Sequence, residues 1–180
     1  HYRSHSFPTR RSSDLKWRTW RRQRFLTDSS RYFDYFSRLL NKSSIQLTGD
    51  ITPSYSCLSS ETMAWVRQEF GQRNIATRVV FLMRDPVERI LSQQRMKLRK
   101  RGELQPDMER NHLLRTAHKL KQQSSQRSNY LHTLKALRQA FAPTDLFIEL
   151  YERLFTEPVY EQLCSHLMVP FQQPDRKSVV

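Results

Sequence analysis

The feature that most constrains the fold is the stretch VVFLMRDP, Val79 to Pro86, in which five apolar residues stop at Arg-Asp-Pro. An apolar run of this length, without polar alternation, predicts a strand buried on both faces in a parallel sheet covered by helices. Asp85 suits the N-cap of a helix, Pro86 suits its first residue, and Glu88 completes an Asp-x-x-Glu capping box. The sequence therefore predicts a strand that passes directly into a helix ending near Lys100.

The remainder of the chain alternates between helical and strand-like patterns. Apolar residues at three- and four-residue spacings predict helices near residues 25–40, 59–70, 109–123, 128–141 and 157–168. Further strands are expected at residues 45–48 and 145–150. This alternation predicts the α/β class, with a partial doubly wound parallel sheet flanked by helices. The chain has three glycines, so it holds neither a Walker A loop nor a GxGxxG fingerprint.

Both ends of the chain read like translated sequencing-adapter DNA. FPTRRSSDL, residues 7–15, is what the adapter oligonucleotide TTC CCT ACA CGA CGC TCT TCC GAT CT encodes, and the reverse complement encodes DRKSVV, residues 175–180. One oligonucleotide read on its two strands accounts for both termini. We therefore expect residues 1–15 and 175–180 to be adapter-derived artefacts, and residues 16–174 to be a partial domain cut at both ends.

The charge of the chain indicates an anionic partner. The net charge is +14, of which the two adapter-like ends contribute +2 and +1, so the central 159 residues carry +11. Such a balance favours nucleic acid, a membrane surface, or a phosphorylated or sulfated small molecule. Cys57 and Cys164 form neither a CxxC nor a metal-ligand pattern, which predicts no metal and favours a reducing, cytoplasmic location. No apolar run approaches the roughly 20 residues of a membrane span.

The strand–helix junction is a candidate anion site. In open α/β sheets ligands bind beyond the carboxyl ends of the strands, which is where Arg84 is expected. Backbone N–H groups at a helix start favour anions, a guanidinium grips phosphate with two hydrogen bonds, and Ser92 adds a hydroxyl two turns on. The alternative is structural: Arg84 pairs with Asp85 or Glu88, and Ser92 bonds a carbonyl one turn back.

Three segments carry a resemblance to a known family. Arg84-Asp85-Pro86, Arg89 and Ser92 resemble the 3′-phosphate-binding segment of sulfotransferases that use 3′-phosphoadenosine-5′-phosphosulfate (PAPS). TGDITPSY, residues 48–55, is similar to the family's strand-end G-(E/D)-x-(S/T)-P-x-Y segment. Residues 130–158 resemble its Y…L…F…strand, Y-E-x-L…P segment. The order and spacing of all three match the family.

The resemblance implies a fold similar to P-loop nucleotide kinases, and transfer of a sulfuryl group from PAPS to a hydroxyl or amine. It implies that Arg84 and Ser92 hold the 3′-phosphate of the cofactor and that Tyr151 lies beside the adenine. Thr52 and Tyr55 would line the acceptor side. Tyr151 also suits simple packing where a strand ends, and a structural turn explains Thr52 and Tyr55 equally well.

Two elements that the reaction needs are not found. The family's N-terminal loop for the 5′-phosphosulfate would precede residue 16, and no residue matches the catalytic base, so we expect this fragment to be inactive. Four histidines are expected on the surface and two glutamates in structural roles: His112, His118, His132, His166, Glu149 and Glu152. The acceptor stays open among carbohydrate, lipid, protein and small molecule.

Two rival classes remain. The +11 charge and the segment KWRTWRRQR, residues 16–24, suggest a nucleic-acid-binding module, but no reader motif is present, so nucleic acid is not expected as a partner. The other is a P-loop kinase relative that lacks its phosphate loop.

Overall fold

The computed structural model describes residue 25 and residues 27–102 and 126–171, which divide between Asp50 and Ile51 into two compact units. The described part of the first unit is built on helix α2 (Ser30–Leu40), in which Phe33 and Phe36 are buried. Aromatic rings pack along this helix, with the Tyr32 and Phe36 ring centroids 4.9 Å apart. The expected domain boundaries near residues 15 and 175, and the helix expected at 109–123, lie outside the described residues.

The strand expected at residues 45–48 is wrong. Residues 45–48 are irregular, and Gln46 and Leu47 are exposed. A strand is stabilised by pairing with a neighbour and by covering one face, and residues 45–48 pair with no other strand of the described chain. Their short apolar alternation is therefore not sufficient to make a strand.

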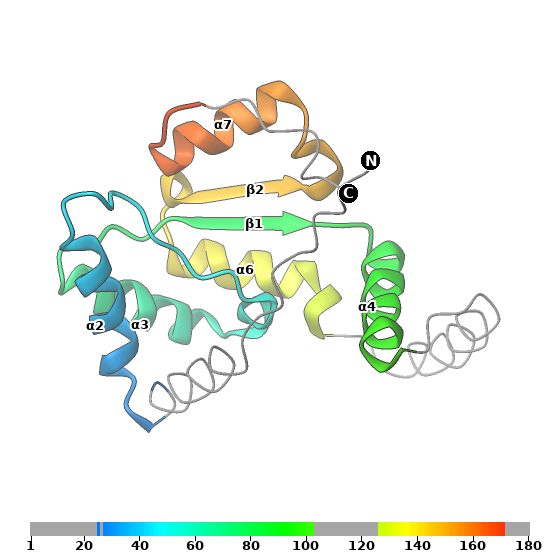
Figure 1. Ribbon diagram of the computed structural model, residues 1–180, viewed down its shortest axis with the longest axis horizontal. Coiled ribbons are helices and arrows are strands. Elements are labelled where there is room, and N and C mark those ends of the chain that lie inside the picture. The colour runs from blue at the N-terminus through cyan, green and yellow to red at the C-terminus, as the bar shows by residue number, and fades with distance from the viewer. Residues whose placement is uncertain (1–24, 26, 103–125, 172–180) are drawn as a thin grey trace, which may run out of the picture. The chain divides into compact units, whose positions relative to one another are not determined.

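The second unit is an α/β arrangement built on two parallel strands, which confirms the predicted class. Strand β1 (Val79–Met83) pairs with β2 (Leu146–Leu150) in a register that runs from Val79 opposite Leu146 to Met83 opposite Leu150. Figure 1 shows helix α6 along β1 and helix α7 along β2. The helices of the unit are α3 (Ser60–Gly71), α4 (Pro86–Arg101), α6 (Tyr130–Ala140) and α7 (Glu157–Leu167). Short 3₁₀ segments are η1 (Pro53–Cys57), η2 (Gln126–Ser128), η3 (Pro143–Asp145) and η4 (Tyr151–Arg153).

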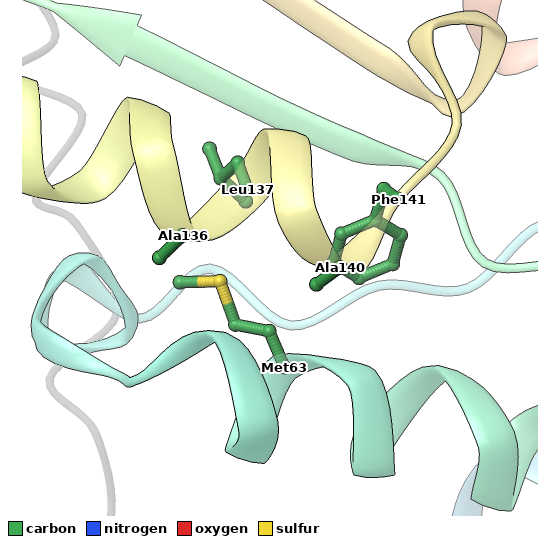
Figure 2. Close-up of a cluster of buried hydrophobic side chains, with 5 residues drawn as sticks. All are labelled: Met63, Ala136, Leu137, Ala140 and Phe141. Atoms are coloured by element: carbon green, nitrogen blue, oxygen red, sulfur yellow. The ribbon is translucent and has the colours of Figure 1, made fainter.

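Helices lie on both faces of this two-stranded sheet, but β1 is less buried than predicted, because Val80 is 38% exposed. On one face, Val79, Phe81 and Leu146 pack against a buried cluster from α3 and α6, formed by Met63, Ala136, Leu137, Ala140 and Phe141. Figure 2 shows Met63 reaching from α3 toward the α6 residues of this cluster. On the other face, the Phe147 ring lies 5.8 Å from the His166 ring of α7. Alternate residues of a strand point to opposite faces, which explains this division.

The amphipathic pattern of α6 is only partly as predicted. Leu137 and Phe141 are buried, whereas Leu131, expected on the same face, is 64% exposed. Thr133 is buried in its place because its hydroxyl donates to the Ser56 carbonyl at 2.8 Å. A hydrogen-bonded threonine can therefore occupy a core-facing helix position that hydrophobicity alone assigns to a leucine.

The helix boundaries follow from capping residues. The Ser59 hydroxyl accepts from the Thr62 N–H at 3.3 Å, and the Asn129 side chain accepts from the His132 N–H at 3.1 Å. Such caps satisfy backbone donors that a helix start leaves free. Helix α3 ends at Gly71 as predicted, and α4 is followed by Gly102 at φ 72°, a left-handed conformation that glycine adopts without strain.

Candidate anion-binding site

The β1–α4 junction forms as predicted, with one exception. The Asp85 carboxylate accepts from the Glu88 N–H at 2.9 Å, and Pro86 is the first residue of α4. The reciprocal half of the capping box is not made, because the Asp85 N–H donates to the Glu152 carboxylate at 3.2 Å. Pro86 has no N–H, and the Glu88 N–H is bonded to Asp85. Few backbone donors at this helix start are therefore open to an anion, and side chains must provide most of the donors.

The parallel register brings Arg84 and Tyr151 together. Met83 lies opposite Leu150, so Arg84 and Tyr151 are the next residues along the two neighbouring strands, at their carboxyl ends. The Arg84 guanidinium carbon lies 5.4 Å from the centre of the Tyr151 ring, within the range of a cation–π contact. Tyr151 itself packs edge-on against Phe155, with ring centroids 5.4 Å apart. The structure thus places two of the expected cofactor residues side by side.

Arg84 also makes the ion pair expected under the structural alternative. Its Nη2 atom lies 3.5 Å from the Glu88 carboxylate, and the two side chains are 34% and 52% exposed. This distance exceeds that of a good hydrogen bond, so the pair is a loose electrostatic contact. Glu88 and Ser92 are one turn apart and share one side of α4. Ser92 is exposed, and no bond joins its hydroxyl to a preceding carbonyl in the described chain.

Three hydrogen bonds fix the junction against the start of α6. The Tyr130 hydroxyl donates to the Arg84 carbonyl at 2.7 Å, and its ring meets Phe81 edge-on at 6.0 Å. The Arg89 guanidinium donates to the Ser128 hydroxyl from both Nε and Nη2, the first at 3.1 Å. The resemblance assigns no role to Arg89, although it belongs to the matched motif, and no sequence pattern indicates a site role for Ser128. Together these bonds hold β1, α4 and the residues that precede α6 in one place.

The expected acceptor residues lie at and just before η1, near the same end of α6. Thr52 precedes η1 and is half-buried, while Tyr55 within it is 38% exposed. The Ser54 hydroxyl accepts from Arg127 Nη2 at 2.9 Å, and Ser56 bonds Thr133 as described above. Residues of η1 and of the β1–α4 junction therefore both contact residues at or just before the start of α6.

The titratable groups near the sheet are structural. Glu152 bonds Asp85, and the Glu149 carboxylate accepts from the Leu150 N–H at 2.8 Å and pairs with Arg153 at 3.5 Å. These contacts agree with the structural interpretation of both glutamates, which stays a prediction. No described residue is positioned as an evident catalytic base.

The histidines differ from one another. His132 is exposed, as expected, and His112 and His118 lie outside the described residues. His166 is less exposed than predicted, because it lies partly buried against Phe147, and its buried Nε2 atom has no hydrogen-bond partner among the described residues. Desolvation by burial, together with the nearby Arg78 charge, lowers the pKa of His166 below its usual 6.5.

Within the described residues, no cluster of three or more His, Cys, Asp or Glu side chains could hold a metal ion, and no helix is long and apolar enough to cross a membrane. No family model, curated protein or solved structure matches this chain. The fold and the junction define an α/β unit with an arginine at the carboxyl end of a parallel strand, beside a helix start. The family resemblance and the roles of the site residues remain predictions.

Proposed function

We propose that this chain is a fragment of a PAPS-dependent sulfotransferase with a P-loop-like fold, in which Arg84 and Ser92 bind the 3′-phosphate of the cofactor. The observation that supports it most is the register of the parallel strands, which sets Arg84 beside Tyr151 at their carboxyl ends. Ligands bind at this edge in open α/β sheets. The Arg-Asp-Pro-x-x-Arg-x-x-Ser motif, through its resemblance to the sulfotransferase segment, indicates that this ligand is the 3′-phosphate of PAPS.

The side chains at this edge fit a phosphate. Arg84 has five N–H donors in a planar fork, and among the residues that the structure describes its carboxylate contact is the loose pair with Glu88. Ser92 adds a hydroxyl donor on the side of α4 that carries Glu88. Two donors from a guanidinium and one from a hydroxyl match the acceptor oxygens of a phosphate monoester. PAPS, when bound, would supply the activated sulfuryl group.

Tyr151 has a double role in this proposal. Its ring holds the Arg84 guanidinium at 5.4 Å and is itself oriented by Phe155. Tyr151 is 38% exposed, which leaves surface for the adenine. Thr52 and Tyr55 line the acceptor side, where the hydroxyl or amine that receives the sulfuryl group would bind. A catalytic base is not among the residues assigned.

The proposal is tested by a nucleotide pair that differs in one group. Binding of 3′,5′-adenosine bisphosphate and of 5′-AMP to this chain is measured by calorimetry, with and without Arg84→Ala. Hydrogen bonds to charged groups contribute about 1.5–3 kcal/mol, so the bisphosphate should bind roughly 10- to 100-fold more weakly while 5′-AMP changes little. Arg138→Ala, at an exposed arginine of α6, controls for the loss of one positive charge. Equal weakening of both nucleotides would remove the 3′-phosphate assignment.

A further inference from the structure

Arg127 is a half-buried cation held by a neutral group. It lies in η2, and its Nη2 atom donates to the Ser54 hydroxyl at 2.9 Å. Four arginines of the described chain pair with carboxylates, as Arg73 does with Glu69 at 2.9 Å, whereas Arg127, like Arg89, is bonded to a serine hydroxyl. A hydroxyl satisfies one N–H of the guanidinium but does not neutralise its charge, so most of the fork remains able to bind an anion.

Within the described residues, the two segments that meet at Arg127 contain no acidic residue. Residues 51–60, which include η1, and residues 126–144, which include η2 and α6, hold neither Asp nor Glu. The next residue, Ser128, accepts from a second guanidinium, that of Arg89. Removing a cation from water costs free energy unless a counter-charge is supplied. The neighbourhood supplies hydroxyls instead, which leaves this part of the surface positive.

The position of Ser54 decides what the anion belongs to. Ser54 lies between Thr52 and Tyr55, the residues proposed for the acceptor side, and it orients the Arg127 guanidinium toward that segment. We infer that the acceptor is an acidic molecule and that Arg127 binds its anionic group, an oxyanion such as a carboxylate or a sulfate. This inference rests on the proposed function, because it takes residues 52–55 as the acceptor side.

Three sugars with the same kind of hydroxyl groups serve as probes: glucose, glucuronic acid and glucose 6-sulfate. Binding to the ¹⁵N-labelled chain is followed through the Nε–H signals of its arginines. Both acidic sugars, or one of them, should shift the Arg127 signal saturably, and glucose should not. Tighter binding of glucuronic acid would indicate a carboxylate, and tighter binding of glucose 6-sulfate would indicate a sulfate. Equal binding of neutral glucose would overturn the inference.

Variants separate recognition from a change in fold. Arg127→Gln should weaken acidic-sugar binding about tenfold, the size of one charge-assisted interaction. Arg127→Lys keeps the charge and loses the fork, and Ser54→Ala keeps the arginine and loses its orienting hydroxyl, so both should give smaller losses. Arg138→Gln is the matched control on α6 and should leave binding unchanged. A loss in Arg138→Gln equal to that in Arg127→Gln would reduce the effect to net charge.

The two proposals fail in different ways. If Arg84→Ala removes the preference for 3′,5′-adenosine bisphosphate while Arg127→Gln leaves acidic-sugar binding intact, the acceptor inference is wrong and the cofactor proposal stands. If Arg84→Ala leaves that preference unchanged, the assignment of an acceptor falls with the proposed function, whatever Arg127→Gln does. Support for both requires each variant to affect its own ligand.

Discussion

Replacing Glu88 by glutamine is expected to strengthen binding of 3′,5′-adenosine bisphosphate. Arg84 must exchange its contact with Glu88 for the phosphate, and the remaining carboxylate would repel the bound anion. Glutamine has nearly the same shape and helix propensity, so α4 should persist. The change therefore removes a competitor for Arg84 and leaves the guanidinium in place.

The size of the effect follows from the geometry of the ion pair. Two unit charges 3.5 Å apart interact by about 1 kcal/mol in a medium like water. Measured exposed pairs contribute about 0.2–1 kcal/mol. Releasing Arg84 from the pair should therefore tighten bisphosphate binding by up to about fivefold. Repulsion between Glu88 and the phosphate adds to this gain, and salt should reduce both.

Calorimetric titration with the bisphosphate and with 5′-AMP, at low and at raised salt, measures the effect. Glu157→Gln is the matched control, since Glu157 is an exposed glutamate in the first turn of α7, another helix with proline near its start. The gain should be confined to Glu88→Gln, to the bisphosphate and to low salt. Unchanged or weaker bisphosphate binding would show that Arg84 does not exchange Glu88 for the 3′-phosphate.

Two further predictions concern stability. Leu137→Ala should lower the free energy of unfolding by about 2–5 kcal/mol, because it opens a cavity in the α3–α6 cluster, whereas Leu131→Ala, at an exposed position, should lower it by less than about 0.5 kcal/mol. Urea unfolding of both variants measures these losses, and similar losses would contradict the packing described. The pKa of His166 is lowered in the folded chain, so its contribution to stability is complete above pH 6.5 and declines as the pH falls through the folded pKa. His166→Phe should therefore reduce the dependence of the free energy of unfolding on pH on the acid side. An unchanged slope would show that His166 does not titrate with unfolding.

The local elements were largely predictable from the sequence. The strand at 79–83, the helix that starts at Pro86, the Asp85 cap and the second strand near 146–150 all depend on interactions within a few residues. The failures have a common origin. Residues 45–48 lack a partner strand in the described chain. The Asp85 N–H, expected to bond Glu88, bonds Glu152 from a distant segment. Thr133, and not the predicted Leu131, is the buried residue near the start of α6.

The candidate site divides in the same way. The motif indicated Arg84 and Ser92, and the strand pattern placed Arg84 at a strand end. Only the parallel pairing of β1 with β2 brought Tyr151, 67 positions later, against the Arg84 guanidinium. Arg127, Ser128 and Tyr130 acquired their contacts through the packing of η2 and α6, and no short-range pattern distinguishes them from other polar residues.

The sequence by itself thus determined where the chain is helical or extended near the junction, because capping and hydrophobic periodicity act over a few residues. It also determined the positive charge and the absence of a glycine-rich phosphate loop in this piece. The tertiary structure decided which side chains meet. Strand register and helix packing depend on contacts between residues far apart in the chain, and these contacts set Arg84 against Tyr151 and Arg127 against Ser54.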